Sequence, residues 1–209
     1  TTPNKLINFH PSLSFDGGDE LLSEHRLFCN SSPFQLISVG LDERSVLTQV
    51  RGTLGMGADG NYPAMDLQTD VNSPNGWNPT MTGGTPAEWN GGTALLYNGN
   101  TGGAKRQPQI FSLGSANAST TATDNIFSWV DGFKQGTTLD AKQQAEIGNR
   151  VWIGSSGDAQ WLGRISEAMV FTRDLTDVEM QRINRYLALN YGITLNQSGD
   201  GLDYLASDA

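Results

Sequence analysis

Oxygen-bearing side chains gather in one stretch of this chain, between residues 57 and 78. Ca²⁺ binds about six to eight oxygen atoms from carboxylate, amide and carbonyl groups, in a shell that tolerates irregular geometry. Glycines and prolines interrupt the stretch, and no helical or strand period runs through most of it, so the backbone could wrap around an ion. We therefore predict Ca²⁺ as the cofactor, with the ligands Asp59, Asn61, Asp66, Asp70 and Asn72.

A plainer interpretation of the same residues is open. Asp and Asn side chains commonly bond their own backbone in turns without any ion, and the stretch lacks the regular spacing of an EF-hand loop. The acidic segment FDGGDE at 15–20 has the same two interpretations, and it could serve only to shape a hairpin. Asp124 and Asp158 flank other turns, where they could line the same rim or be solvated.

Aromatic residues lie in the same polar part of the chain, where no period implies burial. An exposed aromatic ring can stack on a sugar face or clamp a peptide side chain. We predict a ligand-binding role for Tyr62, Trp77, Trp89 and Asn90, with anchoring of the loops as the alternative for the two tryptophans.

Catalytic groups are sparse. A glycosidase needs two carboxylates facing each other across the scissile bond, and no E-x-D pattern occurs in the chain. Glu167 stands alone between apolar neighbours, and we interpret it as a structural acceptor that fastens a loop or the helix end. His10 and His25 are the only histidines, and both are interpreted as surface or packing residues. The chain is predicted not to be an enzyme.

The net charge of −9 would repel phosphate backbones and anionic lipids, and no basic cluster breaks that balance, so nucleic acid is not expected as a partner. Cys29 has no second cysteine to pair with. No apolar run approaches the roughly 18 residues of a membrane span, so no membrane insertion is expected. The chain starts on Thr and lacks a leader pattern, as expected for a monomeric module cut from a longer chain with neighbouring domains.

Short, turn-bounded apolar segments are typical of strands. Asp131-Gly132 supplies the chemistry of a tight hairpin turn. In the last strand, Ile165, Met169 and Phe171 are predicted to share one face, opposite Ala168 and Val170, as in the middle of a sandwich. The predicted strands are 12–15, 34–39, 93–97, 109–113, 126–130, 151–154 and 165–171, and Trp129, Trp152 and Trp161 are expected to pack in them or at their edges.

One helix is predicted, at 177–191. Thr176 and Glu179 have the spacing of a capping box, and Leu175 and Met180 occupy the positions of a hydrophobic staple. Gly192 is placed for the left-handed residue that ends a helix. In contrast, 55–103 is rich in glycine and contains four prolines, so we expect a long irregular loop there.

Several motifs resemble laminin-G-like, concanavalin A-like lectin modules. They are SLSFDGGDELL (12–22), QPQIFSLGSANAS (107–119), FSWVDGFKQGTT (127–138) and the C-terminal unit 147–195, with its G-x-I-x-E-x-x-V-F strand and helix ending Y-L-A-x-x-Y-G-I. The resemblance implies an all-β fold: a single domain over 1–209, built as a two-sheet antiparallel jelly-roll sandwich. Such modules often bind calcium and hold a ligand in loops at one rim.

The version of the module that this chain resembles occurs in large RTX-type bacterial adhesins. This implies a calcium-dependent recognition module of a secreted protein at the bacterial cell surface, whose partner is an extracellular peptide end, protein or glycan. Two alternatives are open: a glycoside hydrolase or lyase of the same fold, and a structural spacer that only links neighbouring domains.

Overall fold

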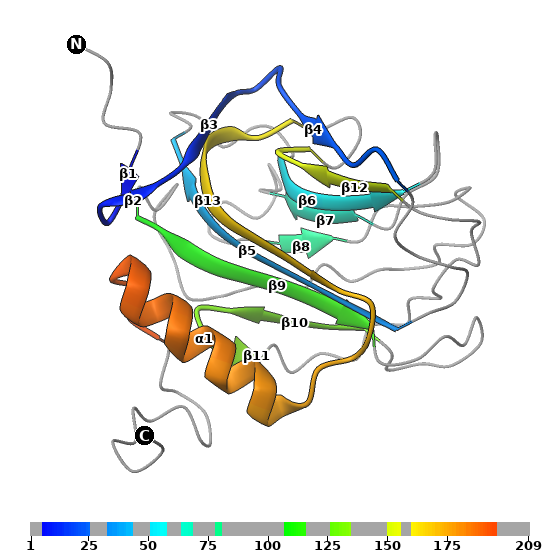
Figure 1. Ribbon diagram of the computed structural model, residues 1–209, viewed down its shortest axis with the longest axis vertical. Coiled ribbons are helices and arrows are strands. Elements are labelled where there is room, and N and C mark those ends of the chain that lie inside the picture. The colour runs from blue at the N-terminus through cyan, green and yellow to red at the C-terminus, as the bar shows by residue number, and fades with distance from the viewer. Residues whose placement is uncertain are drawn as a thin grey trace.

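Two antiparallel sheets, a small hairpin and one helix make up the described part of the chain (Figure 1). The structure is a computed structural model that describes residues 6–25, 33–43, 51–57, 64–68, 78–80, 107–115, 126–134, 150–155 and 160–195. The six-stranded sheet has the order β11 (Phe133–Lys134), β10 (Ile126–Val130), β9 (Gln109–Ser115), β5 (Phe34–Asp42), β13 (Leu162–Phe171), β3 (Leu13–Asp16). The five-stranded sheet has the order β4 (Leu21–Leu22), β12 (Arg150–Ile153), β6 (Arg51–Gly57), β7 (Ala64–Gln68), β8 (Asn78–Thr80). The hairpin pairs β1 (Leu6–Ile7) with β2 (His10–Pro11), and the helix is α1 (Asp177–Tyr191).

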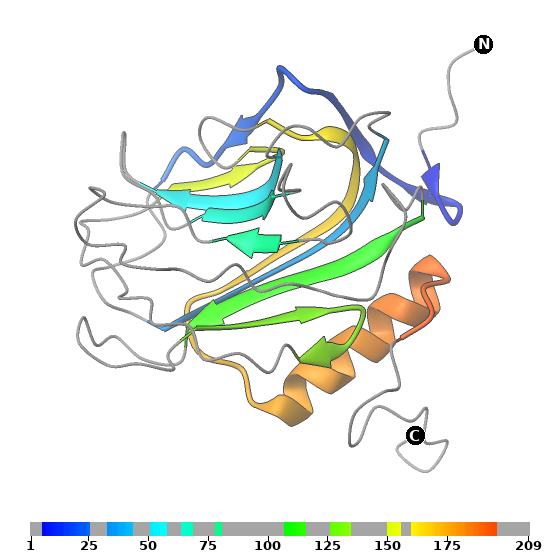
Figure 2. The ribbon, with the colours of Figure 1, turned by 180° about the vertical axis from the view of Figure 1, so that it is seen from behind.

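The six-stranded sheet is covered on both faces. Side chains on one face, such as Leu36 and Phe111, form a core cluster with Leu54 of the five-stranded sheet. Side chains on the other face, such as Ile37 and Ile110, pack in a second cluster with α1, which lies on the side away from the five-stranded sheet (Figures 1 and 2). Burial of each such side chain contributes roughly 1.5–3 kcal/mol. The predicted all-β sandwich with one C-terminal helix is confirmed.

The predicted strands in the described ranges are confirmed to within a few residues, and 93–97 lies outside those ranges. Asp131 and Gly132 join β10 to β11 with φ of 48° and 81°, the pair of left-handed residues that a tight hairpin turn requires.

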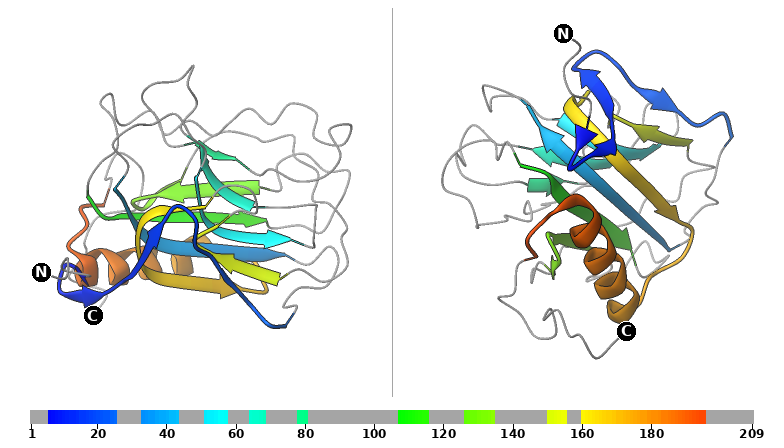
Figure 3. Two further views of the ribbon diagram at one scale, coloured as in Figure 1. Left: turned by 90° about the horizontal axis from the view of Figure 1, so that it is seen from above. Right: turned by 60° about the vertical axis from the view of Figure 1, so that its left-hand side comes forward.

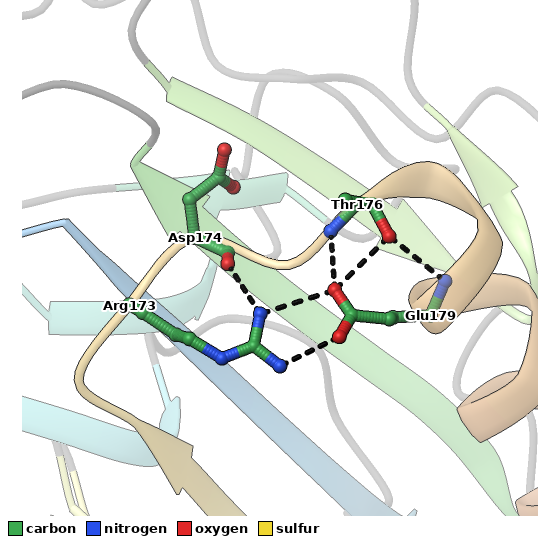
Figure 4. Close-up of polar contacts among 4 residues, drawn as sticks. All are labelled: Arg173, Asp174, Thr176 and Glu179. Carbon is green, nitrogen blue, oxygen red and sulfur yellow. Dashed lines mark hydrogen bonds and ion pairs between the residues drawn. The ribbon is translucent and has the colours of Figure 1, made fainter.

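The helix begins and ends at the predicted residues. Thr176 Oγ1 accepts a hydrogen bond from the Glu179 N–H, and the Glu179 carboxylate accepts one from the Thr176 N–H (Figure 4). Arg173 extends this capping box, because its guanidinium donates to both carboxylate oxygens of Glu179 (Figure 4). Gly192 ends the helix with φ 64°.

The hairpin β1–β2 is fastened to the end of the helix (Figure 3). Its turn residues Asn8 and Phe9 have φ of 46° and 69°. The Asn8 side chain donates a 2.9 Å hydrogen bond to the backbone oxygen of Asn190, and it lies beside Gly192, where a Cβ would come within 3.1 Å of it.

The predicted faces of the last strand are wrong at one residue. Ile165 pairs with Gly40 but Glu167 pairs with Val39, so Ser166 is the extra residue of a β-bulge. The bulge shifts the alternation, so Ile165 faces the core between the sheets, whereas Met169 and Phe171 pack against the helix cluster.

The segment 55–103, expected to be one irregular loop, is corrected in part. It begins inside β6 and contains β7 and β8, which extend the five-stranded sheet. In β7, Met65 and Leu67 alternate with Asp66, which is a strand pattern. Five residues are too few for that pattern to stand out among the surrounding glycines and prolines.

Candidate functional site: two rims of the sandwich

The strand ends meet at two opposite rims. One rim, which we call the Asp16 rim, contains the ends of four strands and the starts of four others. The ends are those of β3, β5, β7 and β12, and the starts are those of β6, β8, β9 and β13. The opposite rim, which we call the Phe34 rim, contains the starts of β5, β7 and β12 and the ends of β6, β8, β9 and β13. Gly154, directly after β12, lies against Phe15 of β3, which joins the two sheets at the Asp16 rim.

The strand directions attach the connections that carry most of the predicted calcium ligands to different rims. The connection from β6 to β7, which carries Asp59 and Asn61, leaves and re-enters at the Phe34 rim. The connection from β7 to β8, which carries Asp70 and Asn72, does so at the Asp16 rim. A strand rises about 3.3 Å per residue, so the two ends of β7 are roughly 13 Å apart. Asp66 lies between them, in the middle of β7.

The predicted ligand-binding residues divide in the same way. Trp77 directly precedes β8 in sequence, and β8 starts at the Asp16 rim; Tyr62 belongs to the connection whose flanking strand ends lie at the Phe34 rim. Trp89 and Asn90 follow the end of β8. Apart from Asp66, whose backbone is described, all the predicted site residues lie outside the described ranges, so these assignments stay predictions: Asp59, Asn61, Tyr62, Asp70, Asn72, Trp77, Trp89 and Asn90.

At the Asp16 rim, the FDGGDE segment carries the chain from β3 in one sheet to β4 in the other. Asp16 Oδ1 accepts a 2.9 Å hydrogen bond from the Gly18 N–H, as in an Asx turn, and Gly17 has φ 92°. Asp16 therefore shapes the turn. Asp19 and Glu20 are exposed.

The same rim contains a buried carboxylate that the sequence analysis missed. Asp131 is 6% exposed, and its two oxygens accept hydrogen bonds from the Ile110 N–H at 2.9 Å and the Gln109 Nε2 at 3.0 Å. The Asp-Gly pair indicated the turn, but the bonds from the start of β9 to the Asp131 side chain are visible only in the folded chain. Asp131 is a structural residue that fixes the start of that strand.

An ion pair between Arg164 and Glu43 lies near this rim. Arg164 Nη2 lies 2.6 Å from Glu43 Oε1, and Arg164 Nη1 donates to the backbone oxygen of Leu6 at 3.2 Å. The pair is partly exposed, so its contribution is at most about 1 kcal/mol. The separate bond from Arg164 to Leu6 ties the hairpin β1–β2 to β13.

Glu167 has the predicted structural role. Its Oε2 accepts a 2.9 Å hydrogen bond from the Tyr191 hydroxyl in the last turn of the helix. Burial, and then the carboxylate, raise the pKa of Tyr191 above its usual value. His10 packs on the Tyr191 ring with centroids 4.9 Å apart, as expected of a packing residue, and His25 is exposed.

The tryptophans predicted to pack do so. Trp161 is fully buried between the sheets, Trp129 is buried against the helix cluster, and Trp152 of β12 is also buried. The Lys134 ammonium lies 5.6 Å from the centroid of the Trp129 ring.

Metal ligation is not seen in the described ranges. Within them, no group of three or more His, Cys, Asp or Glu residues could hold an ion. Likewise, no helix in the described part is long and apolar enough to cross a membrane.

The fold is shared with several solved structures. Domain 4 of AbnA, a GH43 extracellular arabinanase from Geobacillus stearothermophilus in complex with arabinotriose, matches with TM-score 0.57 at 13% identity, over 83% of this chain and 76% of that chain. A native heptameric SAP-like pentraxin from Limulus polyphemus matches with TM-score 0.58 at 11% identity, over 84% of this chain and 82% of that chain.

A Trypanosoma rangeli sialidase in complex with sialic acid matches with TM-score 0.51 at 15% identity, over 77% of this chain but 24% of that chain. No protein-family model and no curated protein sequence matches the chain. At these identities the likeness shows the fold alone, which is a β-sandwich of the concanavalin-like, jelly-roll kind.

Proposed function

We propose that the chain is a non-enzymatic, calcium-dependent recognition module that binds an extracellular glycan or peptide end at the Asp16 rim. The observation that carries the proposal is the strand order, which joins the connections 17–20, 69–77 and 156–159 to this one rim. These connections carry Asp19, Glu20, Asp70, Asn72, Trp77 and Asp158.

The chemistry of these side chains supports the proposal. Carboxylate and amide oxygens bind Ca²⁺, and an ion that is only partly coordinated by protein can take hydroxyl or carboxylate oxygens from a ligand. Trp77 would provide a ring on which a sugar stacks. The AbnA domain, in complex with arabinotriose, supports a glycan as ligand for a sandwich of this kind.

Two further observations favour binding over turnover. The chain has no E-x-D carboxylate pair. The carboxylate of Glu167, in the middle of a long strand, is already engaged, because it accepts a hydrogen bond from the Tyr191 hydroxyl. In the proposed setting, the module is part of a larger secreted adhesin at a bacterial cell surface, and calcium stabilises the rim.

A glycan array and a peptide-display selection, each run with calcium and with chelator, test the proposal. We expect calcium-dependent binding in one of them that is lost in Asp70→Asn/Trp77→Ala and kept in Asp59→Asn/Tyr62→Ala, the matched change at the Phe34 rim. Lack of binding in both screens would contradict the proposal, and release of sugar from soluble polysaccharides would favour the hydrolase alternative.

A further inference from the structure

The outer face of α1, which points away from the six-stranded sheet, carries large apolar side chains. The helix forms the outermost layer of the described fold on its side (Figures 1 and 2). Its inward residues are all buried: Met180, Asn184, Leu187, Ala188 and Tyr191. The exposed residues Val178, Arg182, Tyr186 and Leu189 follow one another at intervals of four, four and three, which places them in a single row on the opposite side. We call this row the outer stripe.

The outer stripe is more apolar than the solvent side of a helix normally is. Val178, Tyr186 and Leu189 are 55%, 57% and 72% exposed. The outward side of an amphipathic helix usually carries charged and polar residues, and single exposed apolar residues are common, but three in one row form a patch. Such a patch indicates a surface that binds another segment.

The outer stripe is also basic, although the chain has a net charge of −9. Arg182 is exposed in the middle of the stripe, and Arg185 lies half-buried beside it. The two acidic residues of the helix are engaged elsewhere, because Asp177 pairs with a lysine of β11 and Glu179 belongs to the capping box. An occupant that combines apolar side chains with carboxylates would therefore match this face.

A second copy of the chain does not have that chemistry at its own outer stripe. Two stripes packed against each other would bring the arginines of both copies together, and like charges across an interface are unfavourable. The sequence that follows the described residues does have it. Residues 196–209 contain three Asp and no Lys or Arg, and the segment DGLDYL at 200–205 combines two of these carboxylates with Leu202, Tyr204 and Leu205.

The described part of the chain ends close enough to the helix for this segment to reach it. Leu195 is buried in the same cluster as the inward side of α1. The seven residues from Leu195 to Leu202 can span roughly 23 Å when extended, about twice the diameter of a helix with its side chains. The chain therefore has enough length to pass from the inward side of the helix to its outer stripe.

We propose that the segment 200–205 binds the outer stripe of α1, with its leucines on Leu189 and its aspartates beside Arg182. A segment held by so short a tether has an effective concentration on the order of millimolar, so an intrinsic Kd in the millimolar range is enough to populate the bound form. The interaction does not depend on the calcium proposal, because none of the residues proposed for the Asp16 rim takes part in it.

The first test uses the unaltered chain with ¹³C-labelled leucine methyl groups. Nuclear Overhauser effects should connect the methyl groups of Leu189 with those of Leu202 or Leu205. Leu13 is the matched control, because it is 51% exposed but lies on β3, and it should show no such connection. Lack of any contact between Leu189 and the segment would overturn the proposal, and this result requires no variant.

A second test removes the apolar groups of the segment. In Leu202→Ser/Leu205→Ser, the methyl signals of Leu189 should shift, whereas those of Leu36 and Leu54, which are buried between the sheets, should stay in place and show that the variant is folded. Adding the peptide acetyl-Gly-Asp-Gly-Leu-Asp-Tyr-Leu-amide to this variant should return the Leu189 signals toward their original positions, with half-saturation on the order of millimolar.

The same peptide tests the charge requirement in the Leu202→Ser/Leu205→Ser background. Arg182→Gln should raise the Kd of the peptide about two- to fivefold, which is the effect of one exposed ion pair. Arg150→Gln, which removes a charge from β12, should leave the Kd unchanged. A peptide with Asn in place of both Asp residues should bind more weakly than the original and lose the dependence on Arg182.

Three results would overturn the proposal in addition to a missing Leu189 contact. The first is equal binding of the Asp and Asn peptides, and the second is a Leu189 signal that does not change in Leu202→Ser/Leu205→Ser. The third is a Leu189 signal that depends on protein concentration in the same way with and without those two leucines, which would assign the outer stripe to a second copy of the chain.

Discussion

The hydroxyl of Tyr191 donates a 2.9 Å hydrogen bond to Glu167 Oε2, which joins the last turn of the helix to the centre of β13. Tyr191→Phe removes the donor and leaves the half-buried carboxylate without it, so the free energy of unfolding should fall by about 1–2 kcal/mol. Urea unfolding measures the change. Tyr186→Phe is the matched control, because Tyr186 is 57% exposed, and an equal loss in both variants would contradict the role of this bond.

The capping box predicts how acid affects stability. The Arg173 hydrogen bond, followed by the bonds from Thr176, lowers the pKa of Glu179 from 4.5 to about 2. A carboxyl group whose pKa is lower in the folded state stabilises the fold above its unfolded pKa and loses that effect as the pH falls. The Tm of the unaltered chain should therefore exceed that of Glu179→Gln by its largest amount above about pH 5, and this difference should shrink toward pH 2.

Glu24→Gln is the control for this experiment, because it removes an exposed carboxylate that caps no helix and is not part of the proposed calcium site. A Tm difference for Glu179→Gln that stays constant from pH 6 to about pH 2 would contradict the lowered pKa of Glu179.

Thr176→Ala removes the oxygen that caps the helix and should lower the free energy of unfolding by about 1 kcal/mol at neutral pH.

Gly154 is required by a close approach between the sheets. It has φ 81°, and a Cβ at this position would lie 2.2 Å from the Phe15 ring. Gly154→Ala should therefore lower the free energy of unfolding by about 2–4 kcal/mol, from backbone strain and overpacking together. At Gly18 a Cβ would meet its nearest neighbour at 3.4 Å, an ordinary contact, so Gly18→Ala should change stability by less than about 1 kcal/mol. Equal effects in thermal melting would contradict the packing argument.

Calcium binding predicts a chelator-sensitive Tm. At an ion concentration tens of times above Kd, binding stabilises by about 2 kcal/mol, or roughly 4–8 °C for a chain of this size. Asp70→Asn/Asn72→Ala should abolish the effect of chelator if the ion lies at the Asp16 rim, whereas Asp59→Asn/Asn61→Ala should preserve it. A Tm that chelator does not change would contradict the calcium proposal.

Local patterns predicted the elements that depend on neighbouring residues. The helix from 177 to 191 follows from Thr176, Glu179 and Gly192, because caps act within one turn. The β10–β11 hairpin follows from the Asp-Gly pair for the same reason. In contrast, the bulge at Ser166 is set by the pairing of β13 with two neighbours far away in sequence, so the simple alternation gave the wrong face for Ile165.

The candidate site was predictable in composition but not in arrangement. The sequence places Asp59 and Asp70, two candidate oxygen ligands, within a short stretch, and this proximity suggested one site. β7 separates the connections that carry them, and this strand was not predicted because its five residues stand among glycines and prolines. The roles of Asp131 and the Glu43–Arg164 pair depend on contacts between distant segments, which no local pattern encodes.

The bond from Asn8 to Asn190 has a mechanical consequence. It places the hairpin at the start of the described chain beside the segment that leaves the helix, so tension applied across these two segments would first load the Asn8 contact and the residues around Gly192. β13 would share this load from the start, because its Arg164 bonds the Leu6 oxygen and its Glu167 bonds the Tyr191 hydroxyl. A pull on these two segments would therefore reach the six-stranded sheet at β13.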